Sequence, residues 1–455
     1  MVDLIKELSH SISKHTHKAV PKTSIETMKI IPLTELSPTQ WGAFRDAQKE
    51  SAKIWMICMG LHAEVRKNHF KWPSKVDLQR ATKGKAKLHS QSIQMVCHAF
   101  LANVETARKL RKEHPNMKAR YPYKEKLFYP LLWPGQAIKY ENGHLTLPMG
   151  RGHQPIKLAV DLEKPPGACR IVWNHGFELH ISQEQIIEET PGDVQATGDL
   201  GQIHQIAVTT STGKALVISG RGIRSEKRLR NKLLGKIASK KSKCKANSKR
   251  SRKLSRARGK VISRAERRCR DLQHKGTAKV IKFCKKEKVG TLFVGNPNGV
   301  QKKNCGRKHN QRMSQWEFGR DLNYLEYKSQ KSGIAFMTGS ERGTSSHCPK
   351  CNHKQKVSGR HWQCRKCDFK GHRDIVGSMN MHKLAYGNII EFPKQETYLR
   401  AGSVRIGRRV NNSSQGQTST RSSCPDTGQS CLRLRKKAST GIFQVARATA
   451  DGLSR

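Results

Sequence analysis

The spacing of apolar and polar positions divides the front of the chain into stretches of different predicted structure. Residues 1–23 are polar and have no regular period, so we expect a loose leader. Between residues 37 and 115 the apolar positions recur at helical spacing and predict a small helical module. Residues 24–36 and 116–193 hold short strand-like segments separated by turns, which predict a small β-barrel or sandwich.

From residue 194 onward strands and helices alternate, which predicts an α/β domain. We place this domain at 194–343 and 371–390, with an insertion at 344–370. Its elements are expected at the following positions: strands at 206–210, 215–219, 291–294 and 333–337, basic helical segments within 221–285, and helices from about 314 and from Asp374. Residues 391–455 are rich in Ser, Gln, Thr and Arg, so we expect a basic and mostly disordered tail.

The net charge of the chain indicates which class of molecule it binds. Its 455 residues include 88 Lys plus Arg but only 34 Asp plus Glu, which gives a formal net charge of +54. Such a field favours a nucleic-acid partner, and a ribosomal or histone-like protein is the simplest alternative. The chain has no apolar run of about 20 residues and no signal-peptide pattern at its start. We therefore expect a cytoplasmic protein without a membrane partner, associated with the nucleoid in a prokaryote.

Paired cysteines give the strongest local motif. Cys348-Pro-Lys-Cys351 is followed, after twelve residues, by Cys364-Arg-Lys-Cys367. Four thiolates at this spacing can close a tetrahedral, structural Zn²⁺ site, and a redox dithiol does not explain the second pair. Since four cysteines complete such a site, we expect the neighbouring histidines on the surface: His347, His353, His361 and His372.

Two aspartates are candidates for a catalytic metal site. Asp199 lies at the end of a predicted strand between small residues, and Asp374 lies at the start of a predicted helix. Alone, the first is typical of a turn and the second of a helix cap. Together, in a nucleic-acid-binding chain, they indicate two-metal hydrolysis of phosphodiesters, in which three or four carboxylates hold two Mg²⁺ ions.

These motifs follow one another in the order found in TnpB proteins, the transposon-encoded relatives of type V CRISPR effectors. The resemblance covers about residues 194–387. It implies an α/β, RNase H-like (RuvC-type) nuclease domain with an inserted zinc ribbon, preceded by a helical recognition module and a wedge-like β-barrel. It also implies an RNA-guided DNA endonuclease of a mobile element, with guide RNA and double-stranded target DNA as partners and no small-molecule substrate.

One position departs from the family pattern. The strand at 291–294 would end in a second catalytic Glu, but this chain has Gly295 and Asn296. Either another acid replaces it, or the protein binds nucleic acid without cleaving it. The candidates are Glu341, just past a predicted strand, and Glu326, on the preceding helix, and Glu341 is the better substitute because functional groups gather at the carboxyl ends of strands. For each, a surface ion pair is the alternative.

The helical segment is the expected nucleic-acid interface. Residues 221–270 contain 22 Lys or Arg and two Glu, so we expect the segment to lie along phosphate or to be disordered without it. Solvated surface charge is the alternative for any single one of them. The candidates for phosphate contacts along an RNA–DNA heteroduplex are Arg228, Arg230, Lys249, Arg250, Arg252 and Arg256. Three functions remain open: a nuclease, a nuclease-inactive RNA-guided repressor, and a zinc-ribbon protein without catalysis.

Overall fold

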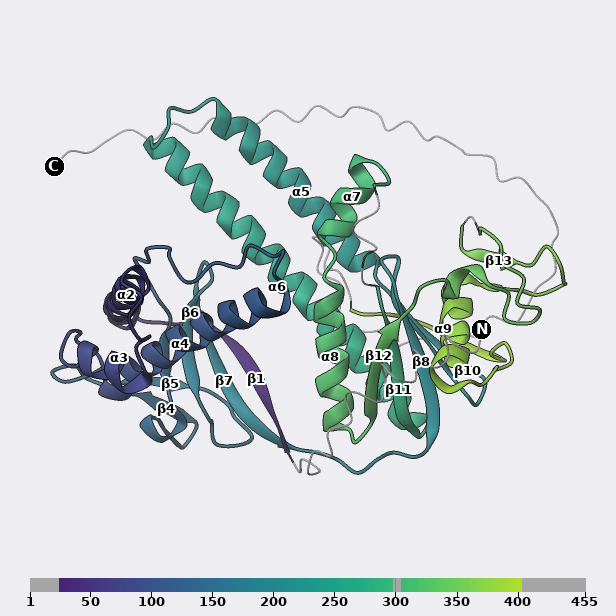
Figure 1. Ribbon diagram of the computed structural model, residues 1–455, viewed down its shortest axis with the longest axis horizontal. Helices are drawn as coiled ribbons and strands as arrows, with labels where there is room; N and C mark the ends of the chain where they lie inside the picture. Colours follow the sequence, from purple (N-terminus) through teal and green to yellow (C-terminus); the bar gives the residue numbers. More distant parts are fainter. Residues whose placement is uncertain (1–23, 298, 300–303, 358, 403–455) are drawn as a thin grey trace, which may run out of the picture. The chain divides into compact units, whose positions relative to one another are not determined.

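The structure is a computed structural model that describes residues 24–297, 299, 304–357 and 359–402 (Figure 1). The predicted leader at 1–23 and most of the predicted tail, 403–455, lie outside the described residues. Among the described helices, none combines the length and the hydropathy needed to span a lipid bilayer.

Seven strands before residue 190 form two antiparallel sheets. The larger sheet has the order β1-β7-β6-β2, and the smaller has the order β3-β4-β5. The strands are β1 (Ser24–Leu33), β2 (Leu131–Trp133), β3 (Lys139–Glu141), β4 (His144–Leu147), β5 (Ile156–Ala159), β6 (Cys169–Trp173) and β7 (Phe177–Ile186). All of them fall in the two ranges where strand-like segments were predicted, because their apolar residues alternate and face one core.

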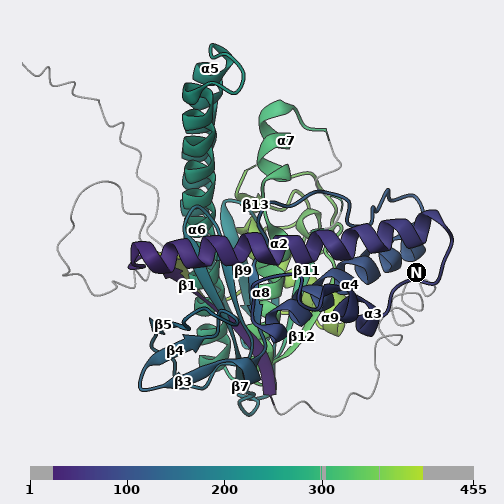
Figure 2. The same ribbon diagram turned by 90° about the vertical axis from the view of Figure 1, so that its left-hand side faces the viewer.

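Three helices lie between β1 and β2 in the chain: α2 (Pro38–Lys67), α3 (Lys75–Thr82) and α4 (Ser90–Glu113) (Figure 2). Capping boxes begin two of them, with Ser37 and Gln40 at α2 and Ser74 and Asp77 at α3. Their apolar faces share one core with both sheets, in which Phe44, Trp55, Phe100 and Trp133 are buried.

A third sheet, of six strands, follows, with the order β12-β11-β8-β9-β10-β15. Its first three strands in sequence form an antiparallel meander, β11 and β12 run parallel to β8, and β15 runs parallel to β10. The bounds are β8 (Val194–Leu200), β9 (His204–Thr210), β10 (Lys214–Ser219), β11 (Val289–Asn296), β12 (Ala335–Ser340) and β15 (Gln395–Arg400). A further short hairpin pairs β13 (His361–Gln363) with β14 (Lys370–His372).

The prediction of a disordered tail from residue 391 is wrong for β15. This strand pairs with β10 from Lys214–Gln395 to Ser219–Arg400. The free edge of β10 offers backbone groups that need partners, and Leu399 packs against the apolar core under the sheet. The composition of this segment predicted disorder, but hydrogen bonding to the edge strand β10 orders β15.

Helices cover both faces of the six-stranded sheet. On one face Ile206 and Val208 of β9 share a core with α6 (Lys249–Lys286) and α8 (Phe318–Lys331), while on the other Ala207 packs against α9 (Arg373–Tyr386). The remaining helices are α5 (Arg221–Ser242), which lies beside α6 (Figure 1), and α7 (Arg307–Ser314). The helix predicted from about residue 314 begins at Phe318, after Trp316 has turned into the core.

The central strand β11 gives a test of this core. Leu292 is fully buried between the sheet and its helices, so we expect Leu292→Ala to destabilise the protein by about 2–5 kcal/mol through lost burial and a residual cavity. Chemical denaturation followed by circular dichroism measures the difference. Leu229→Ala on α5, where the side chain is 47% exposed, is the control and should change stability by less than about 0.5 kcal/mol.

Candidate functional site

The structure brings the two candidate aspartates to one place on the sheet. Asp199 is the second-last residue of β8, and Asp374 is the second residue of α9. Gly377 lies one helical turn after Asp374, on the same face of α9. A Cβ atom at Gly377 would lie 2.5 Å from Oδ2 of Asp199. The carboxylate of Asp199 therefore lies directly against the helix face that carries Asp374.

Hydrogen bonds between small polar side chains hold α9 in this position. Ser378 Oγ donates to the carbonyl of Thr197 (2.8 Å), and Thr197 Oγ1 donates to the carbonyl of Ser378 (2.7 Å). The hydroxyls of Thr209 and Ser378 lie 2.8 Å apart, and all three residues are fully buried. Buried hydrogen bonds of this kind fix one register, because a shift of the helix would leave polar groups unpaired.

Glu341 occupies the space that Gly295 leaves open. It follows directly after β12, whose Gly339 and Ser340 pair with Gly295 and Asn296 of β11. A Cβ at Gly295 would lie 2.8 Å from Glu341 Oε2 and 2.8 Å from the sulfur of Met381. The carboxyl group thus lies where a side chain from position 295 would begin, although it comes from the neighbouring strand.

The second candidate acid, Glu326, is placed differently. Glu326 is exposed on α8, whose buried face is formed by Asp321, Leu325, Lys328 and Ser329. The charged groups that act most strongly on Asp199 are Glu341, Asp374, Arg373 and Arg360. The structure therefore brings Glu341, and not Glu326, to the two aspartates.

The acids differ in their electrostatic surroundings. Burial raises the pKa of Asp199 well above its usual range, and the charges of Glu341 and Asp374 raise it further. Burial also raises the pKa of Glu341 to about 7, and its Oε2 atom is buried without a hydrogen-bond partner among the described residues. Such an unpaired carboxylate oxygen beside a second buried carboxylate is chemically suited to a divalent cation.

Asp374 already has cationic and imidazole partners. His204 Nδ1 lies 2.7 Å from Asp374 Oδ2, and the Arg360 guanidinium donates to both carboxylate oxygens at 2.6 and 2.7 Å. Burial alone would raise the pKa of Asp374, but the His204 hydrogen bond and the Arg360 charge outweigh it and lower that pKa. Asp374 is therefore the acid of the three that stays ionised most readily.

The expectation that His372 lies on the surface is wrong. Its ring is half-buried beside His204, with ring centroids 5.0 Å apart, and burial lowers its pKa to about 4. His204, His372 and Asp374 form a group that could hold a metal ion, whereas Asp199 and Glu341 lie outside that tight group. His204 and Arg360 are not among the predicted site residues, since only folding brings the start of β9 and the segment between the cysteine pairs to Asp374.

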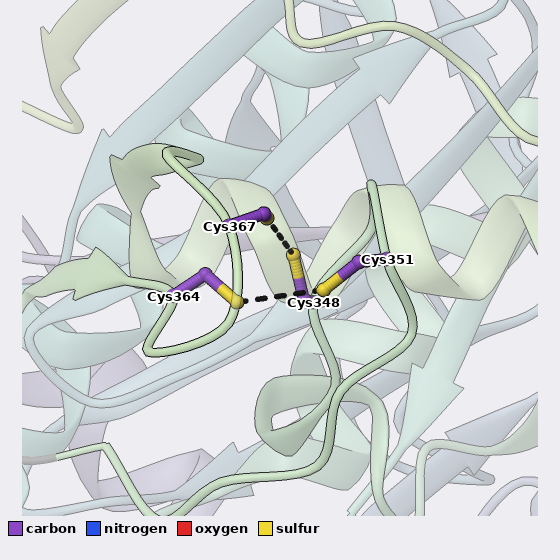
Figure 3. Close-up of side chains that lie close together, drawn as sticks. All are labelled: Cys348, Cys351, Cys364 and Cys367. Carbon is purple, nitrogen blue, oxygen red and sulfur yellow. Dashed lines mark hydrogen bonds between the residues drawn. The ribbon is translucent and has the colours of Figure 1, made fainter.

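The four predicted cysteines come together in the structure (Figure 3). The sulfur atoms of Cys348 and Cys367 lie 3.6 Å apart, and those of Cys351 and Cys364 lie 3.5 Å apart. Thiolates around one tetrahedral Zn²⁺, with Zn–S bonds of about 2.3 Å, lie about 3.8 Å from one another. The cluster could therefore close around a zinc ion with a small adjustment.

The cysteine cluster is joined to α9. Trp362 of β13 is fully buried and packs with Cys348, Cys364 and Val376 of α9. The side-chain amide of Asn380 donates to two carbonyls at the start of the cysteine segment, those of Thr344 and His347. A change in the cysteine cluster should therefore alter the packing of α9, the helix that carries Asp374.

The predicted phosphate contacts lie on α5 and α6. The two helices run beside each other (Figure 1). Arg230 is half-buried and donates to the Asn231 side chain. The other candidates are exposed and form no ion pair within the described part of the chain: Arg228, Lys249, Arg250, Arg252 and Arg256. Their charge is free for a polyanion.

An α/β domain with buried carboxylates at one end of its sheet, a cysteine cluster beside them and two basic helices defines a nucleic-acid-processing type of protein. Comparison with known families agrees. Residues 178–301 match the family model described as "Probable transposase", and residues 318–381 match the model "Cas12f1-like, TNB domain". These matches confirm the resemblance to the TnpB family that the sequence motifs predicted.

Individual relatives agree with the family models. A CRISPR-associated endodeoxyribonuclease Cas12f1 from an uncultured archaeon is 25% identical over 130 residues, which are 27% of this chain and only about a quarter (25%) of that relative. Among solved structures, a Cas12f1–sgRNA–target DNA complex has a TM-score of 0.56 at 14% identity and covers 79% of this chain and 99% of that chain. At this identity the structural match supports the mixed α/β fold alone.

Removing a cysteine ligand tests the cysteine cluster. We expect Cys348→Ser to lose one zinc ion per chain, because three thiolates cannot close the site. Elemental analysis of the purified full chain measures the metal content, and limited proteolysis should show faster cleavage between residues 344 and 370. Cys305→Ser is the control, since Cys305 is exposed and outside the cluster. Equal zinc content in both variants would contradict the assignment.

The pH dependence of cation binding tests the carboxylates. Because burial raises the pKa of Glu341 to about 7, this group is mostly protonated at about pH 6 and ionised at about pH 8. A divalent cation must displace that proton, so we expect Mn²⁺ or Mg²⁺ to bind more tightly as the pH rises through this range. Calorimetry in two buffers of different ionisation heat measures the released protons. Glu341→Gln should reduce this proton release, with Asp199 left as the other acid of raised pKa, and an unchanged value would exclude Glu341 as a ligand.

Proposed function

We propose that the chain is an RNA-guided DNA endonuclease of a mobile element, and that its back half is an RNase H-like (RuvC-type) nuclease domain interrupted by a zinc ribbon. Three antiparallel strands, β8 to β10, followed by two parallel strands, β11 and β12, on the other side of β8, support this fold. The observation that carries the proposal is the approach of Asp199 to the α9 face that bears Asp374, with Glu341 in the space at Gly295.

In this proposal Asp199, Glu341 and Asp374 hold Mg²⁺. Bound Mg²⁺ supplies an activated water and stabilises the leaving oxygen of the phosphodiester. His204 and Arg360 orient the carboxylate of Asp374, and the absence of a side chain at Gly377 admits Asp199. The unpaired Oε2 of Glu341 supplies the charge that Asn296 cannot.

The proposed partners are a guide RNA and double-stranded target DNA, the kinds of partner present in the similar solved complex. The exposed cations of α5 and α6 would lie along phosphates of an RNA–DNA heteroduplex, whose shape rather than sequence is read by such proteins. We also propose that α2 to α4 form the helical recognition module, that the two antiparallel sheets form the wedge-like β-barrel, and that the four cysteines hold structural zinc.

A nuclease-inactive, RNA-guided binding protein is the second candidate. The Arg360 guanidinium already neutralises Asp374, so that carboxylate has a cationic partner without a metal ion. The absence of an acid at position 295, where this chain has Gly295, also favours a protein that binds without cleaving. Both proposals use the same nucleic-acid surfaces, and they differ only in whether the phosphodiester is broken.

Cleavage by matched variants tests the proposal. The full chain, purified with the RNA that accompanies it, is incubated with a plasmid library and Mg²⁺, and cut ends are sequenced. We expect Asp199→Ala to abolish cleavage and Glu341→Gln to slow it more than about 100-fold, because metal-ion stabilisation of the transition state is worth several kcal/mol. Glu326→Gln is the matched control and should cleave like the unmodified chain.

Two other results have clear meanings. Guide-dependent binding of DNA with no cleavage by the unmodified chain would support the inactive, repressor-like protein. Cleavage that survives Glu341→Gln but is lost in Glu326→Gln would show that the exposed acid on α8, and not Glu341, replaces the missing one.

A further inference from the structure

A hollow at the ends of α2 and α4 lies outside the carboxylate site. It has a volume of about 550 Å³, within the range of about 300–1,000 Å³ that is usual for small-ligand sites. Helix α2 ends at Lys67, and His69 takes a left-handed backbone conformation with φ 56°. The Phe70 N–H then donates to the carbonyl of Val65, which folds the chain back over the last turn of α2. This turn places Phe70 and Trp72 at the hollow.

Aromatic rings line the hollow. Phe70 is 65% exposed and Trp72 is 37% exposed. The ring of Trp72 is held by edge contacts with Tyr121, at 5.3 Å, and with buried His62, at 5.0 Å. The packed ring of Trp72 and the exposed ring of Phe70 both line the cavity. Together they give a surface on which a flat, unsaturated ring can stack.

Cations complete the lining. Arg66 lies in the last turn of α2 and Arg111 in the last turn of α4, and both pack on the Tyr121 ring, at 4.8 and 5.1 Å from its centroid. With Lys67 they contribute three positive charges, whereas two helix C-termini carry only about half a negative charge each. The lining contains no acid, and none of the three forms an ion pair within the described residues. The excess positive charge favours an anionic ligand.

From stacking rings and unpaired cations in one hollow we propose that this pocket binds one unpaired nucleotide of a nucleic-acid strand. Its base stacks on Phe70 and Trp72, and its phosphates lie against Arg66, Lys67 and Arg111. A base pair inside a duplex presents no free face for such stacking, so the ligand is a single-stranded or flipped-out position. The pocket needs no cleavage, so this proposal is independent of whether the carboxylate site is active.

Site-specific crosslinking tests the pocket. The full chain is mixed with short single-stranded oligonucleotides that carry one 5-iodouridine, in an RNA arm and a DNA arm, irradiated, digested and analysed by mass spectrometry. We expect crosslinks in the peptide that contains Phe70 and Trp72. Stacking on one ring contributes about 1–3 kcal/mol per base, so Phe70→Ala should lower the yield there about 10-fold, and Phe70→Tyr should restore it.

Matched variants distinguish the pocket from general attraction to a basic protein. Phe128→Ala removes an aromatic side chain of similar exposure outside the pocket and should leave the yield unchanged. Arg66→Gln should lower the yield and flatten its salt dependence, because one phosphate contact is lost. Crosslinks found only on α5 and α6 in both arms, or a Phe70→Ala yield equal to that of the unmodified chain, would overturn the proposal. The arm that crosslinks identifies the strand as RNA or DNA.

Discussion

The close packing of α9 on β8 and β9 is the constraint on which the candidate site depends. Hydrogen bonds among Thr197, Thr209 and Ser378 fix the helix in one register, and Gly377 lets the carboxylate of Asp199 reach the helix. A larger residue at Gly377 would separate the sheet from the helix that carries Asp374. Small residues at this interface therefore set the distance between α9 and the sheet, as bulky apolar residues set the distances between elements elsewhere in the core.

Concentrating acids in one region carries an electrostatic cost, even in a chain with a formal charge of +54. Burial raises the pKa values of Asp199 and Glu341, and the charges of Glu341 and Asp374 raise that of Asp199 further, so both acids resist ionisation until a cation is near. Asp374 differs, because His204 and Arg360 stabilise its charge. A site of this kind gains most from a divalent cation at Asp199 and Glu341, for which the described part of the chain supplies no ion pair.

Positive charge is used differently in different parts of the chain. The guanidinium of Arg360 forms an ion pair with the carboxylate of Asp374. The exposed cations on α5 and α6 that we predict to contact phosphate, and the three around the aromatic hollow, have no acidic partners among the described residues. Their mutual repulsion is costly unless a polyanion or solvent screens it. The cysteine cluster, by contrast, links its own segment to α9 through Trp362 and Asn380 and so supports the site without contacting the carboxylates.

The sequence by itself determined the elements whose signals are local. Cysteine spacing identified the four clustered thiols, and apolar periodicity identified the strands from β8 to β12, because side-chain period and ligand spacing are set by nearby residues. Only the tertiary structure decided which distant groups meet. It placed Glu341, which the sequence already favoured over Glu326, in the space at Gly295. It also brought His204 and Arg360 to Asp374 and paired β15 with the edge of β10. These outcomes depend on strand register and helix packing across more than a hundred residues, which no local pattern encodes.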